Sequence, residues 1–302
     1  MTLFLSIGEA MVELSRAPEG AGPDLWRLGF AGDTLNTAWY ARACLPESWQ
    51  VEYLTRLGQD PFSPRMLEFL AQSRIGTEHV TIDPARSVGL YSIELHDGER
   101  SFAYWRGQSA ARHLAEDTGA LDRAFAAADA IYLSGITLAI LPEAGREALI
   151  DRLIGARAEG KVTAFDPNLR PKLWESAEAM RHWLTAAGEG SQILLPSFED
   201  EAQWFGDVSL RACAERWQDA GAGEVIVKNG GGAMGLLEAG GYSEIEVESA
   251  RPVDSTGAGD SFNGGYLAAR LTGTSPARSA LRGHAIARQV IAAPGALVPV
   301  TA

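Results

Sequence analysis

The segment Asp254-Ser-Thr-Gly-Ala-Gly-Asp-Ser-Phe-Asn-Gly-Gly265 is the most informative part of this sequence. Gly257 and Gly259 stand at the start of a predicted helix, and Asp260 falls in its first turn. The N-terminus of a helix carries unpaired N–H groups and a partial positive charge, and glycines let an anion approach that backbone closely. The segment therefore predicts a site for a phosphate or a developing anion, in which Asp260 accepts a proton from a substrate hydroxyl.

The same residues also have a simpler interpretation, in which Asp260 is a favourable first-turn acid and the glycines form a tight turn from strand to helix. A Walker A loop is excluded because no Gly-Lys-Ser/Thr follows at the required spacing. Gly8 does not open a Gly-x-Gly-x-x-Gly fingerprint either, which disfavours an NAD-dependent oxidoreductase. A non-catalytic sugar or nucleotide sensor is disfavoured by Asp260, since a sensor needs no positioned base.

Outward from this segment, short apolar runs alternate with longer amphipathic stretches along the chain. Strand followed by helix, repeated many times, predicts an α/β protein with a parallel sheet and helices on both faces. Strands are expected at 3–8, 51–57, 130–134, 162–166, 193–196 and 224–228, and helices at 34–44, 61–74, 142–159, 176–187, 199–205, 210–220, 258–271 and 276–292.

Two stretches, 25–30 and 88–104, instead alternate apolar with polar residues, as one-sided antiparallel strands do. Asp97-Gly98 is a strong hairpin signal within the second stretch. We therefore expect a small inserted β-sheet, a lid built from about 10–30 and 88–106, with one face to be covered by a ligand or a second subunit. Because no linker or repeat is found, residues 1–302 are expected to form a single domain.

Two further polar segments are candidates for ligand binding. Lys228-Asn-Gly-Gly-Gly-Ala-Met-Gly235 follows a predicted strand, so it forms either a shelf for a flat ring or phosphate, or a hairpin turn between 225–227 and 234–237. Ala31-Gly-Asp-Thr-Leu-Asn36 leads into a helix that Asp33 or Thr34 is expected to cap.

Two arginines follow predicted strands, in Phe102-Ala-Tyr-Trp-Arg106 and Asp166-Pro-Asn-Leu-Arg170. The planar guanidinium suits carboxylates and phosphates because it donates two parallel hydrogen bonds. Either arginine is otherwise a solvated surface charge.

Composition limits the classes of partner. The chain has 302 residues, with 26 Lys and Arg against 39 Asp and Glu, and a net charge of -13. This acidic balance disfavours nucleic acid and anionic membranes as partners. No long apolar run predicts a membrane span, and residues 1–8 are interpreted as a first strand rather than a signal peptide. Cys44 and Cys213 match no metal-ligand spacing and suggest a reduced, cytoplasmic setting.

Together these segments resemble the ribokinase-like (PfkB) family of sugar kinases over essentially the whole chain. Segment 254–260 resembles the C-terminal signature of that family, and segment 32–36 resembles its N-terminal sugar-binding signature. The resemblance implies a three-layer α/β/α fold with a mostly parallel sheet and a small β-sheet lid.

Within the family, several segments are most similar to kinases that phosphorylate the 6-hydroxyl of 2-keto-3-deoxygluconate with ATP and Mg²⁺. These segments are 7–14, 30–36, 104–106, 132–140, 166–171 and 173–174. A fructokinase or a 2-dehydro-3-deoxygalactonate kinase is the alternative activity. Homo-oligomerisation through the lid is also expected.

The resemblance implies roles for individual residues. Asp260 would be the base, and the N–H groups of Gly257, Ala258 and Gly259 would form the anion hole. The sugar acid would be bound by Gly32, Asp33, Thr34, Asn36, Tyr91, Tyr104, Arg106, Arg170 and Asp260. The nucleotide would be bound by Asn168, Arg170, Lys228, Gly230, Gly231, Gly232, Ala233, Gly257, Gly259 and His284. The two arginines would supply the cations that a carboxylate-bearing substrate requires.

The sequence departs from the family pattern in Pro196-Ser-Phe-Glu-Asp-Glu201. Many members have an Asn-x-x-Glu motif there that organises Mg²⁺ through water, whereas this chain has Ser197 or Phe198 in place of the asparagine. An acidic capped helix is the simpler interpretation, so no metal-organising residue is assigned. The metal itself is expected, because the phosphates of ATP otherwise repel the incoming oxygen.

Overall fold

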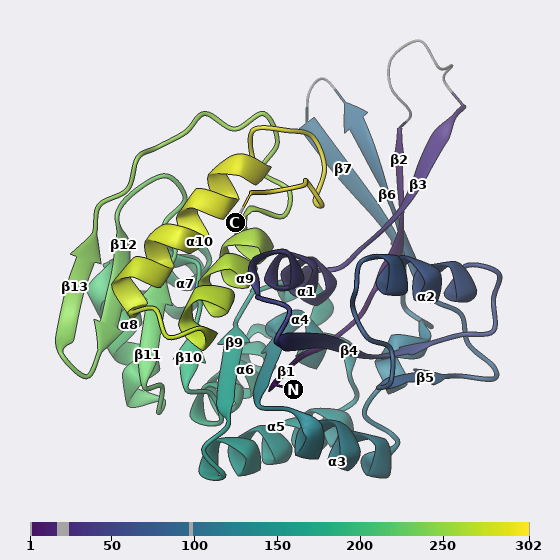
Figure 1. Cartoon of the computed structure of the whole chain (residues 1–302), viewed down its shortest axis with the longest axis horizontal. Helices are drawn as coiled ribbons and strands as arrows, with labels where there is room; N and C mark the ends of the chain where they lie inside the picture. Colours follow the sequence, from purple (N-terminus) through teal and green to yellow (C-terminus); the bar gives the residue numbers. More distant parts are fainter. Residues whose placement is uncertain (1, 17–23, 97–98, 302) are drawn as a thin grey trace.

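The computed structural model describes residues 2–16, 24–96 and 99–301. Its main feature is a nine-stranded sheet in the order β13-β12-β11-β10-β9-β8-β1-β4-β5 (Figure 1). The strands from β11 to β5 in this order are parallel, and β12 and β13 extend one edge as antiparallel strands. The bounds are β1 Thr2–Ile7, β4 Trp49–Leu57, β5 Val80–Ile82, β8 Ala130–Ser134, β9 Val162–Asp166, β10 Ile193–Leu194, β11 Glu224–Val227, β12 Met234–Glu238 and β13 Gly241–Ile245.

Helices cover both faces of this sheet, and the central strands are accordingly apolar on both sides. In β1, Leu3, Leu5 and Ile7 pack into the core on one face and Phe4 packs into the core on the other. Helices α1, α9 and α10 lie on the Phe4 face, with α9 between the other two, and α3, α5, α6 and α8 cover the opposite face (Figure 1). The predicted fold class is therefore confirmed.

The helices span α1 Asp33–Cys44, α2 Ser63–Gln72, α3 Thr118–Ala127, α4 Gly135–Ile140, α5 Glu143–Ala158, α6 Ala177–Glu189, α7 Phe198–Phe205, α8 Leu210–Asp219, α9 Ala258–Leu271 and α10 Pro276–Val290, with short 3₁₀ turns at Ala110–His113 and Pro171–Leu173. Each of the eight predicted helical ranges overlaps one of them. In the described ranges, none of the helices is long and apolar enough to cross a bilayer.

A second, four-stranded sheet stands away from the main one, in the order β3-β2-β6-β7 (Figure 1). Its strands are β2 Met11–Arg16, β3 Trp26–Ala31, β6 Gly89–His96 and β7 Glu99–Trp105. The expectation of purely antiparallel pairing is wrong for one pair, because β2 and β6 leave the main sheet in the same direction and pair parallel. The predicted hairpin turn at Asp97-Gly98 lies outside the described residues.

The connection after β11 is a turn between two antiparallel strands, since β11 pairs with β12 from Val225↔Leu237 to Val227↔Gly235. The carboxyl ends of the parallel strands meet at one edge of the main sheet, which is where open α/β sheets bind ligands. Ser134, Asp166 and Lys228 all lie at this edge, at the ends of β8, β9 and β11.

Candidate active site

Asp260 and Asn36 come from segments far apart in the sequence and lie in contact. The Asn36 amide donates to Asp260 Oδ2 at 2.8 Å, and the Thr37 hydroxyl donates to the Asp260 carbonyl oxygen at 3.3 Å. These contacts arise because α1 packs along α9, with Asn36 in the first turns of one helix and Asp260 in the first turn of the other. The packing of these two helices brings the two predicted signatures into one site.

Gly257 is the N-cap of α9, and its φ of 74° lies in the left-handed region. A Cβ here would also lie 2.6 Å from the carbonyl oxygen of Ala296, so both the backbone and the available space require glycine. No side chain caps the helix, and the Ala258 N–H donates to the Ser255 carbonyl at 3.2 Å. Of the three N–H groups predicted to bind an anion, that of Ala258 is already engaged.

The charges around Asp260 favour a carboxyl group that titrates near neutral pH. Burial and then the negative charge of Asp33 raise its pKa to about 7, and Asp166 adds to the increase. The hydrogen bond from Asn36 and the charge of Lys228 act in the opposite direction. A general base works best when its pKa lies near the working pH, so this environment suits proton abstraction.

The Lys228 side chain lies beside the start of α9. It does not lie on the glycine-rich turn that follows Lys228 in the sequence. Its ammonium donates to Asp166 Oδ2 at 2.8 Å and to Asn263 Oδ1 at 3.1 Å, and a Cβ on Gly259 would lie 3.8 Å from it. The Asn263 amide in turn donates to Asp166 Oδ2 at 2.6 Å. A buried cation therefore stands next to the predicted anion hole.

The predicted sugar-binding loop meets the end of β8. The expectation that Asp33 or Thr34 caps α1 is wrong, because Gly32 is the N-cap and no side chain caps the helix. Asp33 instead accepts hydrogen bonds from the Ser134 hydroxyl and, at 2.9 Å, from the Asn168 amide. These bonds hold the Asp33 carboxylate close enough to Asp260 to raise the pKa of Asp260.

Thr34 is placed differently from its neighbours. It is fully buried, and its hydroxyl is 2.8 Å from the Tyr53 hydroxyl. A Cβ on Gly8 would lie 2.3 Å from Thr34 Oγ1, which shows how closely this side chain packs behind the loop. The Thr34 side chain therefore supports the loop from within the core and is not at its surface.

The lid contributes an aromatic face and one arginine. Tyr91 and Tyr104 are paired across β6 and β7, and their rings stack with centroids 5.8 Å apart. Tyr91 is buried and donates to the Glu13 carboxylate, whereas Tyr104 is 54% exposed. Arg106 is already paired with the buried carboxylate of Glu9. The two tyrosines lie on one sheet face, next to that arginine.

The predicted nucleotide shelf and His284 border the same stretch of chain. Gly230 has a positive φ of 54°, and a Cβ on Gly231 would lie 3.5 Å from the Ser249 Cβ. His284 Nε2 lies 2.9 Å from the carbonyl oxygen of Glu248. The turn that contains Gly230, Gly231, Gly232 and Ala233 and the His284 side chain of α10 therefore both border residues 248–249.

Comparison with known proteins places this site in a family. The whole chain, residues 1–302, matches the family described as pfkB family carbohydrate kinase. The chain belongs to the pfkB family of carbohydrate kinases. A 2-dehydro-3-deoxygluconokinase from Dickeya dadantii (strain 3937) is 40% identical over 305 residues, which is 98% of this chain and 96% of that protein.

Solved structures show the same fold. A PfkB protein from Polaromonas sp. JS666 superposes with a TM-score of 0.83 and 26% identity, covering 96% of each chain. A putative Ribokinase II from E. coli, solved in complex with ATP and Mg²⁺, superposes with a TM-score of 0.81 and 24% identity, covering 98% of this chain and 94% of that one. The predicted family and its ribokinase-like fold are confirmed.

Segment 196–201 departs from the pfkB pattern, and two of its acidic residues lie in different environments. Asp200 lies 3.8 Å from the half-exposed Arg170 guanidinium, and burial raises the pKa of its carboxyl although Arg170 lowers it. Glu201 is turned into the core against Arg216, and burial raises its pKa to about 8. The Asp200 side chain is 34% exposed and could face a hydrated Mg²⁺, whereas the Glu201 carboxylate is buried against Arg216 and could not.

Another acidic cluster, in the part of the chain that the structure describes, does not suit a metal. Glu201, Asp207 and Cys213 approach one another closely, but the Arg216 guanidinium bonds to both carboxylates and supplies the positive charge there. We therefore interpret this cluster as an ion-pair network that joins α7 to α8.

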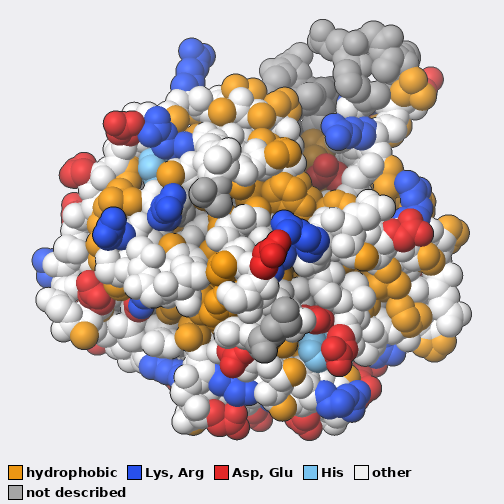
Figure 2. All heavy atoms as spheres, in the orientation of Figure 1, with side chains coloured by type: hydrophobic (Ala, Val, Ile, Leu, Met, Phe, Trp, Pro, Cys, Tyr) orange, Lys and Arg blue, Asp and Glu red, His pale blue; other side chains and the backbone are white. Residues whose placement is uncertain are grey.

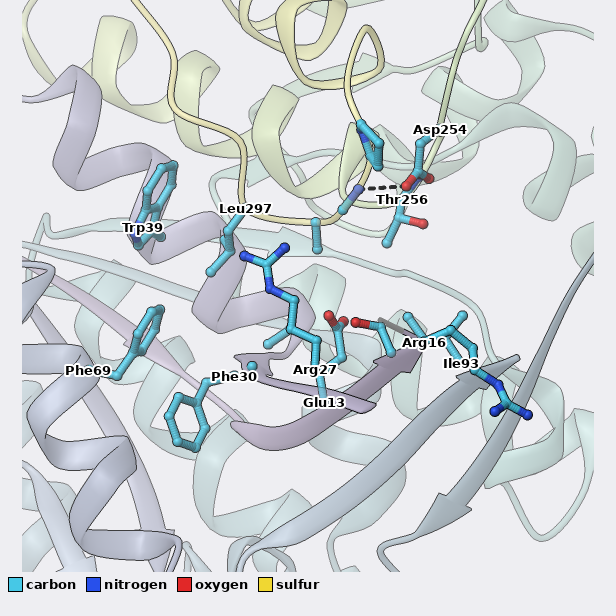
Figure 3. A pocket seen from close by; sticks show the side chains of 16 residues that line it. Glu13, Arg16, Arg27, Phe30, Trp39, Phe69, Ile93, Asp254, Thr256 and Leu297 are labelled. Atoms are coloured by element: carbon cyan, nitrogen blue, oxygen red, sulfur yellow. Dashed lines mark hydrogen bonds between the residues drawn. The ribbon is translucent and has the colours of Figure 1, made fainter. Parts of the chain in front are cut away.

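A cavity of about 620 Å³ lies between the lid and the body (Figure 3). None of its lining residues was predicted individually as a site residue, although Asp254 and Thr256 belong to the segment with which the predicted anion site begins. Glu13 and Ile93 line the cavity, and Glu13 pairs with Tyr91 across β2 and β6. The cavity therefore lies next to residues predicted to bind the sugar. The alternation of apolar and polar residues within Met11–Arg16 was the sequence signal from which β2 could have been predicted. The other walls come from β3, α1, α2 and the segments 254–256 and 294–297.

Proposed function

We propose that this pfkB kinase transfers the γ-phosphoryl group of ATP to the 6-hydroxyl of 2-keto-3-deoxygluconate, giving the 6-phosphate and ADP. The observation that carries the proposal is the 40% identity, over nearly the full length of both chains, to a protein named 2-dehydro-3-deoxygluconokinase. The site geometry supports the chemistry, since a carboxyl base and a helix N-terminus stand side by side.

In this proposal Asp260 accepts the proton of the sugar hydroxyl as the oxygen attacks the phosphoryl group. Its raised pKa of about 7 makes the carboxylate basic enough for that transfer near neutral pH. The N–H groups at Gly257 and Gly259, with the Lys228 ammonium beside them, stabilise the charge on the phosphoryl oxygens. Asp200 would hold a hydrated Mg²⁺, which when bound would neutralise charge between the nucleotide phosphates and the incoming oxygen.

The remaining predicted residues divide between the two ligands. The hydroxyls of the sugar acid are assigned to Asp33, Asn36, Tyr91 and Tyr104, which line the loop and the lid around Asp260. Its carboxylate is assigned to Arg106 and Arg170. The nucleotide is assigned to Asn168, to the shelf at Gly230, Gly231, Gly232 and Ala233, and to His284.

The proposal extends to assembly and location. The lid leaves Leu25, Phe102 and Trp105 exposed by 55, 44 and 61%, which supports a homo-oligomer in which a second copy covers the lid. Cys44 and Cys213 are both free thiols, which supports the expectation of a reducing cytoplasm.

The substitution Asp260→Asn tests the chemical step. Removing the base while keeping the shape should lower kcat about 10²- to 10⁴-fold, with Kd values for ATP and the sugar acid near those of the wild type. Turnover is measured as ADP release, and binding by calorimetry. A variant that keeps a large share of the turnover would show that Asp260 is not the base.

A further inference from the structure

Glu9 and Arg106 form a buried ion pair at the base of the lid. Glu9 follows β1 and Arg106 follows β7, so the pair joins the body to the lid. The two side chains are only 1% and 10% exposed. In the described part of the chain, neither Glu9 oxygen accepts a conventional hydrogen bond, so Arg106 is the partner of this carboxylate.

Two glycines make room for Glu9. A Cβ on Gly32 would lie 2.3 Å from the Glu9 carbonyl oxygen, and a Cβ on Gly89 would lie 2.6 Å from Glu9 Oε1. Gly32 caps the helix of the predicted sugar loop, and Gly89 is the first residue of β6. Glu9 therefore occupies a fitted position between the sugar loop and the lid.

The pair has opposing effects on an anionic ligand. A guanidinium that is nine-tenths buried is strongly destabilising without a counter-ion, and Glu9 supplies one when no ligand is bound. The same negative charge reduces the attraction between Arg106 and any carboxylate that binds beside it.

We propose that Glu9 is the resident counter-ion of Arg106 and thereby sets the affinity of the site for a sugar acid. It balances the charge of the lid arginine and orients it in the free protein, and on binding it shares that charge with the substrate carboxylate. Glu9 is thus a positioning residue that tunes selectivity between acidic and neutral sugars. This inference rests on the proposed function, in which Arg106 meets the substrate carboxylate.

The test is a double-substitution cycle with Glu9→Gln, Arg106→Gln and the variant carrying both. Two quantities are measured for each protein: the KM for 2-keto-3-deoxygluconate, and the inhibition constant of D-fructose, a neutral ketose. Glutamine keeps the size of each side chain and removes its charge. The double variant holds a neutral pair, so it remains informative if one single variant is too unstable to purify.

Charge sharing predicts a definite pattern. Glu9→Gln should lower the KM for the sugar acid by roughly tenfold and leave the inhibition constant of D-fructose unchanged. Arg106→Gln should raise the KM, because it leaves a buried carboxylate facing the substrate, and adding Glu9→Gln should recover part of that loss. The sugar acid alone should also raise the Tm of Glu9→Gln by more than it raises that of the wild type.

Glu224→Gln is the matched control, because Glu224 forms another ion pair, with Arg270 at 2.8 Å, at the opposite end of β11 and α9 from Lys228 and Asp260. It should reduce stability without changing the ratio of the two constants. If Arg106→Gln raises the KM but Glu9→Gln leaves it unchanged or raises it, the inference is overturned and the proposed function stands. An unchanged KM in Arg106→Gln overturns the role of Arg106 and this inference together.

Discussion

At the scale of single residues, the site depends on carboxylates held close together. Asp33, Asp166 and Asp260 all lie at the carboxyl edge of the sheet, where Asn168 donates to Asp33, Lys228 to Asp166 and Asn36 to Asp260. This crowding makes Asp260 a stronger base than an ordinary aspartate. It also makes the protonation state of Asp260 sensitive to its neighbours.

The pH dependence of turnover tests this crowding. Because the pKa of Asp260 is raised to about 7, wild-type kcat/KM should fall as the pH falls through about 7 and the base becomes protonated. Asp33→Asn removes the charge that, after burial, contributes most to that increase, so the acidic limb should move to lower pH, whatever happens to the maximum rate. The profile is measured from about pH 5 to 9. An unchanged limb would mean that Asp33 does not set the pKa of the base.

The sequence allowed some of these residues to be predicted and not others. Asp260 was predicted because it stands in the first turn of a helix that opens with glycines, and Asn36 because its segment resembles the sugar-binding signature of the family. Thr34 packs against Tyr53, 19 positions away in the sequence, and Arg106 pairs with Glu9, 97 positions away. Such contacts form only in the folded protein and leave no local sequence pattern.

At the scale of elements, the start of α9 is fixed by the segment that covers it. The Tyr40 hydroxyl donates to the Ala296 carbonyl at 2.8 Å and accepts from the Val298 N–H at 2.9 Å, which ties this segment to α1. The Ala296 carbonyl then lies directly against Gly257. The backbone geometry of the anion hole therefore depends on contacts among α1, α9 and the C-terminal segment.

Gly257→Ala tests that dependence. The left-handed backbone and the contact with Ala296 should together cost about 1–3 kcal/mol of the free energy of unfolding, and kcat should fall. Gly230→Ala is the control, because Gly230 also has a positive φ but has open space around it, so only the backbone strain of about 1 kcal/mol applies. The free energy of unfolding of both variants is measured with urea. If the two variants lose the same free energy of unfolding, a role for the Ala296 contact is contradicted.

Most elements were predictable because their hydrophobic periods are clear, and the exceptions have physical causes. α4, after β8, has only six residues and is too short for its hydrophobic period to be recognised. It begins where Ser134 accepts a hydrogen bond from the Thr137 N–H. The pairing of β2 with β6 depends on the direction in which each leaves the main sheet, which no local pattern encodes.

At the scale of the whole molecule, the net charge of -13 does not oppose binding of two anionic ligands. Acidic and basic side chains are interspersed over the face seen in Figure 2, so no single charged patch dominates it. Anion binding is assigned instead to a few buried or half-buried cations and to the N-terminus of α9. The overall charge contributes to solubility and the local charges to recognition.

The exposed aromatic residues of the lid give a test of assembly. Trp105→Glu places a charge on a residue that is 61% exposed, and it should shift the protein toward a smaller species in sedimentation velocity. Val208→Glu is the control, since Val208 is 89% exposed in the connection between α7 and α8, away from the lid. A sedimentation coefficient that is the same for Trp105→Glu and the wild type would argue against association through the lid.

The most direct test of the central claim is ADP release by the wild-type protein with ATP, Mg²⁺ and a panel of sugars. The panel holds 2-keto-3-deoxygluconate, 2-keto-3-deoxygalactonate, D-fructose and D-ribose. We predict the highest kcat/KM for 2-keto-3-deoxygluconate, with a product phosphorylated at the 6-hydroxyl. An equal or higher kcat/KM for a neutral sugar would contradict the assignment.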